Sequence, residues 1–134
     1  MHIIAYTDKD CRDIRISVKA LKALAEAKRL RVMALLAYTG RALCVCELVD
    51  ATDESQYNVS RCLGALCVAG LVKKEKKGRW AMYSLAQASG PLAAYVLRLV
   101  KPRPCCPVVA ADIARLKKRL GLRQKGVCVV GCKC

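Results

Sequence analysis

The sequence has 134 residues, 55% of them apolar, which is enough for one ordinary domain with a single hydrophobic core. Phenylalanine is absent and aromatic residues make up only 4%, so the core must come from Leu, Val, Ala and Cys, which suits helices better than a sheet sandwich. The net charge of +15 favours a polyanionic partner such as duplex DNA, although charge can also serve solubility alone. The longest apolar run, 63–72, is well short of the ~20 residues that span a membrane.

The N-terminal residues show no basic stretch followed by a long apolar run, so no signal peptide is expected and the protein is predicted to be cytoplasmic. Its ten cysteines would then be reduced, which indicates ligation or sensing rather than a disulfide framework. No Cys-x-x-Cys occurs, which argues against a thioredoxin-type enzyme and a zinc ribbon. The single histidine, His2, offers little acid–base chemistry, so we do not expect an enzyme.

Residues 14–38 carry apolar side chains at three- and four-residue spacing, with Lys and Arg between them, and predict a helix that Gly40 ends. Residues 43–50 predict a short apolar helix. Residues 52–54 predict a turn.

The helix predicted over 55–69 has an apolar face and a polar N-terminal end, and Gly70 follows it as a stop signal. Asp53 and Gln56 are spaced as a capping box for its first turn. A short helix, a turn and such a second helix form a helix-turn-helix, in which the start of the second helix meets base edges. The candidate DNA-reading residues are Ser55, Gln56, Tyr57, Asn58, Ser60 and Arg61.

Two β-prone runs within 71–85 flank Lys77-Gly78 and predict a hairpin, the wing of a winged helix. Lys76, Lys77 and Arg79 near its tip are the candidate phosphate contacts, which would fix register without reading sequence. The alternative is a solvated hairpin edge protected by lysines.

A further helix is predicted to open at Ser89-Gly90-Pro91, and because 92–100 is apolar almost all round we expect it to be buried in the core or against a second subunit. Residues 101–104 break it, a helix follows near 108–120, and the tail is expected to be mobile. The predicted organisation is an N-terminal arm (1–13), a winged helix-turn-helix DNA-binding and dimerisation domain (14–100), and a basic, cysteine-rich C-terminal extension (101–134). The predicted fold is mainly α with a β-hairpin wing, as a homodimer.

Four segments together resemble the ArsR/SmtB winged-helix metalloregulators, in their arsenical-resistance repressor branch. These segments are 43–48 with Cys44-Val45-Cys46, 55–63, Gly70-Leu71-Val72, and 78–85 with Gly78-Arg79-Trp80. The resemblance covers about 14–99 and implies a homodimer that occupies double-stranded operator DNA and leaves it when As(III) or Sb(III) binds.

The sequence departs from that family at two positions. Arsenic-type members often carry a third cysteine where this chain has Val49, and a histidine where it has Cys62. The helix at 91–100 also lacks the Asp and His residues of the zinc-sensing branch, which disfavours zinc. The third sulfur ligand is therefore not identified by the motif.

Cys44 and Cys46 are the candidate metal ligands, because thiolates select soft ions; the alternative is two small apolar core residues. Residues i and i+2 point to nearly opposite sides of a helix, so one ion can bind both only if the helix start unwinds or tilts. Cys11 is the candidate third ligand by resemblance to the cadmium- and lead-sensing branch, where an arm cysteine reaches the other subunit. Secondary candidate thiols are Cys105, Cys106, Cys128, Cys132 and Cys134, the last three as a site independent of the switch.

These observations predict a repressor with no permanent cofactor, induced by As(III) or Sb(III). The alternatives are a thiol-redox or persulfide sensor of the same fold, or a Cd(II) or Pb(II) sensor.

Overall fold

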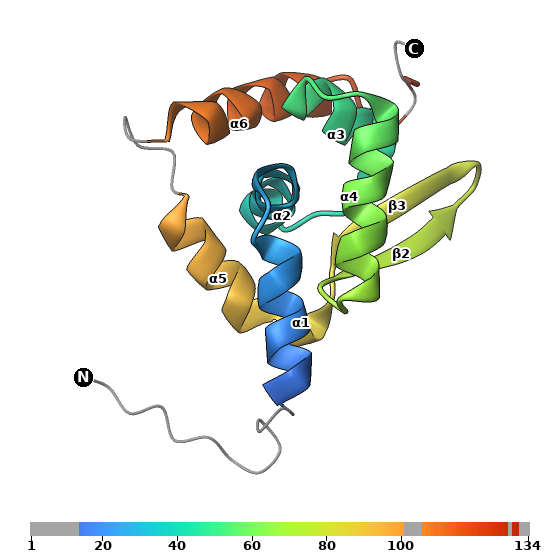
Figure 1. Ribbon diagram of the computed structural model, residues 1–134. Helices are drawn as coiled ribbons and strands as arrows, with labels where there is room; N and C mark the ends of the chain where they lie inside the picture. The colour runs from blue at the N-terminus through green and yellow to red at the C-terminus, as the bar shows by residue number, and fades with distance from the viewer. Residues whose placement is uncertain (1–13, 101–105, 129, 132–134) are drawn as a thin grey trace.

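The computed structural model describes residues 14–100, 106–128 and 130–131. Within these residues, six α-helices, a 3-10 turn and a three-stranded antiparallel sheet follow one another. Their bounds are α1 Ile14–Leu24, α2 Ala27–Thr39, β1 Leu43–Cys44, α3 Val45–Thr52, α4 Gln56–Val68, β2 Val72–Lys77, β3 Trp80–Leu85, η1 Gln87–Ser89, α5 Gly90–Leu99 and α6 Pro107–Leu120. In Figure 1 the other helices surround α2, and the β2–β3 hairpin projects to one side. The mainly α fold with a hairpin wing is confirmed.

The single helix predicted over 14–38 is two helices, because the helical conformation is interrupted at Glu26. Glu26 is extended and its carboxylate accepts hydrogen bonds from the backbone N–H groups of Lys28 (3.2 Å) and Arg29 (3.0 Å). The apolar spacing continues across this break, and Glu is not among the usual N-cap residues, so the sequence pattern concealed it. Gly40 ends α2 in the left-handed conformation (φ 62°), as predicted.

The helix-turn-helix consists of α3 and α4. Ser55 is the N-cap of α4, and its hydroxyl accepts from the Asn58 N–H at 3.1 Å. The predicted capping box of Asp53 and Gln56 is wrong, because Asp53 closes α3 instead: it is left-handed (φ 56°) and its N–H donates to the Val49 carbonyl. The predicted apolar face of α4 is confirmed for four buried residues, Val59, Cys62, Leu63 and Leu66.

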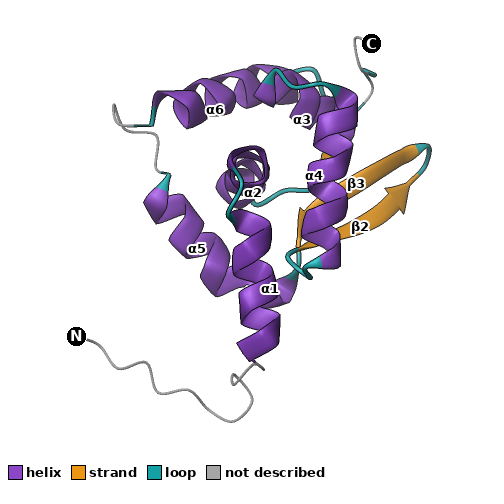
Figure 2. Cartoon of the chain, in the orientation of Figure 1, coloured by secondary structure: helices purple, strands orange, loops and turns teal. Residues whose placement is uncertain are grey.

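The wing is an antiparallel hairpin in which Lys77 pairs with Trp80 across a turn at Gly78 (φ 61°), as predicted (Figure 2). Its inner strand β3 also pairs with the two-residue strand β1, where Cys44 faces Met82. The sheet order is therefore β1-β3-β2, and β1 was not predicted because two residues carry no periodicity.

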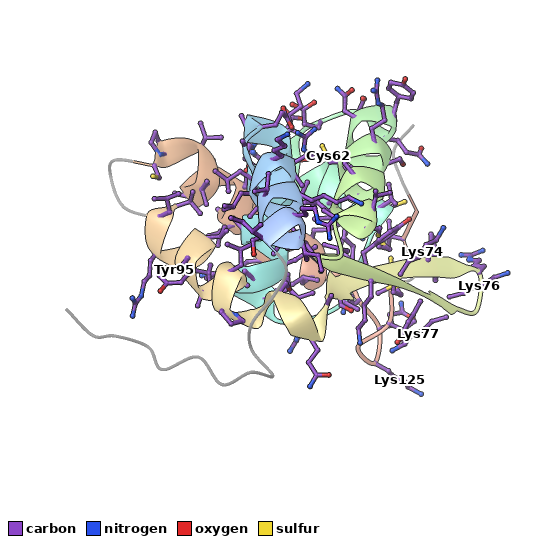
Figure 3. All side chains as sticks on the ribbon, turned by 60° about the horizontal axis from the view of Figure 1, so that its bottom comes forward. Cys62, Lys74, Lys76, Lys77, Tyr95 and Lys125 are labelled. Carbon is purple, nitrogen blue, oxygen red and sulfur yellow. The ribbon has the colours of Figure 1, made fainter. Side chains whose placement is uncertain are left out.

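Helix α5 begins at Gly90 with Pro91 in its first turn, as predicted. It buries Ala93 and Val96, whereas Tyr95 and Leu99 are 57% and 73% exposed. Tyr95 stands on the outer side of the fold in Figure 3. The helix is thus buried on one face only in the described chain. No helix among the described residues is both long and apolar enough to cross a membrane.

Helix α6 packs along α3 and α2. Arg119, expected off its apolar stripe, is buried, and its Nε lies 2.7 Å from the Asp50 carboxylate. The mobile tail expected after Gly121 is wrong for 121–128, because this segment folds back onto the start of α3, where its Cys128 is buried. These two contacts place the C-terminal extension against the helix-turn-helix.

Candidate thiol site and nucleic-acid interface

Cys44 is the N-cap residue of α3. Its backbone is extended (φ −87°, ψ 164°) because it belongs to β1, and its side chain accepts the Glu47 backbone N–H. In return the Cys44 N–H donates to Glu47 Oε1 at 3.1 Å. This capping box fixes the Cys44 sulfur at the start of α3, in a position 1% exposed.

The structure brings Cys128 to Cys44, with 3.2 Å between the two sulfurs. Both belong to a small buried cluster with Cys46 and Met82, against which Trp80 packs. One ligand atom from each of Cys44, Glu47 and Cys128 lies within 4.8 Å of the others. This cluster of cysteine side chains is thus assembled from residues that are far apart in the sequence.

The C-terminal extension is anchored at this site by a buried ion pair. Arg123 Nε donates to Glu47 Oε2 and Arg123 Nη2 to Glu47 Oε1, both at 2.6 Å. Arg123 Nη2 also donates to the Ala42 carbonyl at 2.7 Å. Since Glu47 is fully buried, this two-point contact neutralises a carboxylate that water cannot reach.

The electrostatics of the site follow from burial and from that ion pair. Burial is the largest influence on Glu47 and would raise its pKa, but the hydrogen bonds from Arg123 and from the Cys44 N–H outweigh it and lower the pKa below 4.5. For Cys44, burial dominates and raises the pKa to about 12. Cys44 is therefore a neutral thiol near pH 7 in the absence of a ligand.

The other cysteines fall into four groups. Cys46 is disulfide-bonded. Cys62 and Cys67 are free on α4, where burial raises the pKa of each thiol, in keeping with a packing role. Cys106 is half-buried and is the N-cap residue of α6. The predicted ligand Cys11 and the secondary thiols Cys105, Cys132 and Cys134 lie outside the described residues.

Sequence reasoning missed Glu47 and Arg123, and assigned Cys128 to an independent tail. One signal was present: Lys125-Gly126 is a turn dipeptide between Gln124 and Val127, and the structure pairs these two residues in a tight antiparallel turn with positive φ at both central positions. That turn returns the chain toward α3 and could have indicated an ordered segment.

Arginines also hold α6 to the end of α3. The Arg31 guanidinium donates two hydrogen bonds of 2.8 Å to the buried Asp112 carboxylate and one of 2.6 Å to the Thr52 carbonyl. Arg115 donates to the same carboxylate at 2.7 Å and to the Ala51 carbonyl at 2.8 Å. These donors satisfy carbonyls at the C-terminus of α3, so both ends of this helix are bound to the C-terminal extension.

The predicted DNA-reading residues lie at the start of α4, where five of the six are exposed and Asn58 is half-buried. Tyr57 is 67% exposed, and the Arg61 guanidinium lies 5.5 Å from its ring centre and donates to its hydroxyl at 3.3 Å. Asn58 donates to Glu54 at 3.1 Å, so its amide already has a partner. Tyr57 and Arg61 therefore form the projecting pair of this face.

The wing carries exposed cations along its length. Lys74, Lys76 and Lys77 extend from the hairpin in Figure 3. Arg79 stacks over the Trp80 ring at 4.8 Å. The start of α4 is suited to contacts with base edges, and these cations are suited to contacts with the phosphates of duplex DNA.

A helix-turn-helix followed by a lysine-rich hairpin defines the class of winged helix-turn-helix regulators. Solved structures of that class are similar to this chain. HlyU from Vibrio cholerae N16961 matches with a TM-score of 0.59 and 29% identity, over 64% of this chain and 92% of that one. A homodimeric winged helix-turn-helix domain, Mb0332 from Mycobacterium bovis, matches with a TM-score of 0.58 and 26% identity, over 72% and 89%.

Residues 26–74 match the family model described as bacterial regulatory protein, arsR family. The chain is 39% identical over 71 residues to the arsenical resistance operon repressor of Escherichia coli K12, covering 53% of this chain and 60% of that protein. It is 38% identical over 85 residues to the arsenic resistance transcriptional regulator ArsR1 of Pseudomonas putida KT2440, covering 63% and 66%. The match therefore spans less than two thirds of either relative.

Proposed function

We propose that this protein is a DNA-binding transcriptional repressor of an arsenical-resistance operon, released from its operator when As(III) or Sb(III) binds cysteine sulfurs. The observation that carries the proposal is the position of Cys44 and Cys46: both belong to one buried cluster at the start of α3, the helix packed against the DNA-reading helix α4. The names of the two relatives support the arsenical inducer.

The chemistry of the site suits a neutral trivalent metalloid. Arsenous acid, As(OH)3, condenses with three thiols to give As(SR)3 and three waters, so three As–O bonds are replaced by three As–S bonds and arsenic stays trivalent. The thiol protons leave in the water, and no net charge is buried. A divalent cation such as Cd(II) would instead have to displace the protons of buried thiols, including Cys44, whose pKa is about 12.

Ligation would reach the DNA surface through the start of α3. Cys44 is the N-cap residue and Cys46 lies two positions on, so drawing their sulfurs to one atom distorts the first turn of α3. The same backbone pairs with β3 of the wing through Cys44 and Met82. A coupling of about 1–3 kcal/mol, common for allosteric proteins, would reduce operator occupancy by one to two decades.

On DNA the protein would act as a cytoplasmic homodimer. The apolar residues Val18, Tyr95 and Leu99 on the outer faces of α1 and α5 are exposed in the single chain and would meet a second copy. Gln56, Tyr57, Asn58 and Arg61 would then read bases, with Ser55 and Ser60 beside them, while Lys76, Lys77 and Arg79 hold phosphates.

A thiol-redox sensor of the same fold is the second candidate. It is favoured by the disulfide at Cys46 and by the short approach of Cys44 to Cys128. In that case an oxidant such as a peroxide or persulfide, rather than a metalloid, would change the operator affinity.

The test is fluorescence anisotropy of the reduced full-length protein on the promoter of the operon that encodes it, titrated with arsenite. The wild type should bind, and its affinity should fall at least tenfold with arsenite. Cys44→Ser and Cys46→Ser should bind DNA equally well and stay bound, while Cys67→Ala, a half-buried thiol on α4, should respond normally. Release by peroxide and not by arsenite would select the redox candidate, and failure to bind the promoter would contradict both.

A further inference from the structure

We propose that Cys128 is a ligand of the inducer site, contributed by the C-terminal extension of the same chain and positioned by the Arg123–Glu47 ion pair. The inference rests on the proposed function and replaces the expected arm ligand Cys11 with a cysteine that the fold has already placed. The ligand it would take is a trivalent metalloid bound by the three sulfurs of Cys44, Cys46 and Cys128.

The spacing of the sulfurs supports chelation. A soft ion about 2.3 Å from each of two sulfurs, with an angle of about 90–109° between the bonds, holds those sulfurs about 3.3–3.8 Å apart. The Cys44 and Cys128 sulfurs are 3.2 Å apart, so they need to separate by only a few tenths of an ångström. A disulfide would require them to approach by more than about 1 Å, to about 2.05 Å.

The surroundings determine which atoms can serve as ligands. Both Glu47 oxygens accept hydrogen bonds from Arg123, and one also accepts the Cys44 N–H, so Glu47 is held as an anchor and not offered to a metalloid. Cys46 belongs to the same cluster and supplies the third sulfur after a dithiol reductant opens its disulfide, the reductant being oxidised to its own disulfide. Trp80 and Met82 cover the group and exclude water, which would otherwise hydrolyse As–S bonds.

Completion of the site within one chain changes the nature of the switch. The extension crosses the start of α3, where Arg123 binds Glu47 and Cys128 meets Cys44. It then reaches the wing, where Gly131 lies beside the ring of Trp80, the first residue of β3. A metalloid bound there ties the extension to both parts of the DNA-binding unit at once. Each chain then carries its own site, and the partner subunit is not needed to complete it.

The first experiment uses reduced full-length protein with arsenite as the probe, and counts the sulfur neighbours of arsenic by X-ray absorption. The wild type should show three sulfurs, and Cys128→Ser two sulfurs and one oxygen, with at least tenfold more arsenite needed for release from DNA. Cys67→Ala and the double change of Cys132 and Cys134 to Ser should behave as wild type. Three sulfurs and a normal response in Cys128→Ser would overturn the inference.

The positioning role of Arg123 is tested separately. Arg123→Met should keep three sulfur neighbours at saturation but require more arsenite to reach it, because the thiols remain and their placement is lost. An unchanged arsenite requirement would refute this role. If arsenite fails to release even the wild type from DNA, the proposed function fails. If the wild type and Cys128→Ser respond alike, the proposed function stands and this inference alone fails.

Mixing Cys44→Ser chains with Cys128→Ser chains decides whether the site lies within one chain. After denaturation and refolding together, a mixed dimer has no complete site if each site is made by one chain. It has one complete site if Cys44 and Cys128 come from different chains. The expected result is no tightly bound arsenic in the mixed dimer, and one arsenic per two chains would overturn the single-chain arrangement.

Discussion

Replacing Arg123 by Ala should destabilise the protein strongly, although Arg123 lies in a segment that follows the last helix. The change removes both hydrogen bonds to Glu47 and the one to the Ala42 carbonyl, and leaves a fully buried carboxylate without its cation. Removing one partner of a buried ion pair costs about 3–5 kcal/mol, because the remaining charge stays desolvated. That is a large part of the roughly 5–15 kcal/mol that stabilises a domain.

The loss of stability in Arg123→Ala cannot exceed the free energy with which the segment after Gly121 docks on the rest of the protein. If the segment after Gly121 detaches, water reaches Glu47, and the loss becomes the free energy of docking that segment. Both responses reduce stability, but only detachment makes 122–131 sensitive to protease. For a chain of this size each kcal/mol lowers the melting temperature by about 3–5 °C, so the loss of about 3–5 kcal/mol should lower it by about 9–25 °C.

The measurement is urea and thermal unfolding of wild type, Arg123→Ala and Lys118→Ala. Lys118 is an exposed cation on α6 and controls for loss of one positive charge. The double variant Glu47→Gln with Arg123→Met should recover much of the loss, because no buried charge remains. An Arg123→Ala protein within about 0.5 kcal/mol of the Lys118→Ala control would refute the buried ion pair.

Further outcomes concern pH, DNA and ion selectivity. Because the folded pKa of Glu47 lies below 4.5, its stabilisation is complete above that pH and is lost as pH falls through the lower folded value; in acid titrations Glu47→Gln should therefore lose less stability than wild type. Arg61→Ala should weaken operator binding by about 1–3 kcal/mol and relax sequence preference, measured against single-base operator variants. Lys77→Ala should weaken all sequences alike and reduce the salt slope by about one unit, and a changed sequence preference would contradict the wing contact. Arsenite affinity should vary little between pH 7 and 8, whereas Cd(II) affinity, measured in parallel, should rise with pH because protons must be displaced.

The DNA-binding half could be predicted from the sequence because its signals are local. Helix α4 shows its apolar face within one stretch, and the wing shows two β-prone runs around Lys77-Gly78. The errors there concern caps: Glu26 breaks a helix whose apolar spacing runs on, and Asp53 ends one helix rather than beginning the next. Caps depend on the backbone conformation of a single residue, which periodicity does not report.

The thiol site could be predicted only in part, because half of it depends on a distant contact. Cys44 and Cys46 stand out by their spacing, but Cys128 is 84 residues from Cys44 and Arg123 is 76 residues from Glu47. Nothing local to Arg123 distinguishes it from the other cations of a basic extension. The buried carboxylate of Glu47 in α3 needs a cation to neutralise it, and only the folded structure shows that this cation is Arg123.

The C-terminal extension contacts α3 at both of its ends. Its first turn is bound through Glu47 to Arg123, and its last carbonyls are bound by Arg31 and Arg115. Because the last turn of α3 is fixed by these hydrogen bonds, it cannot fray to absorb a distortion of the first turn. A change of a few tenths of an ångström between the Cys44 and Cys128 sulfurs would then shift the first turn of α3 against α4. On the proposed function, the extension makes the DNA-reading helix sensitive to a ligand that never touches it.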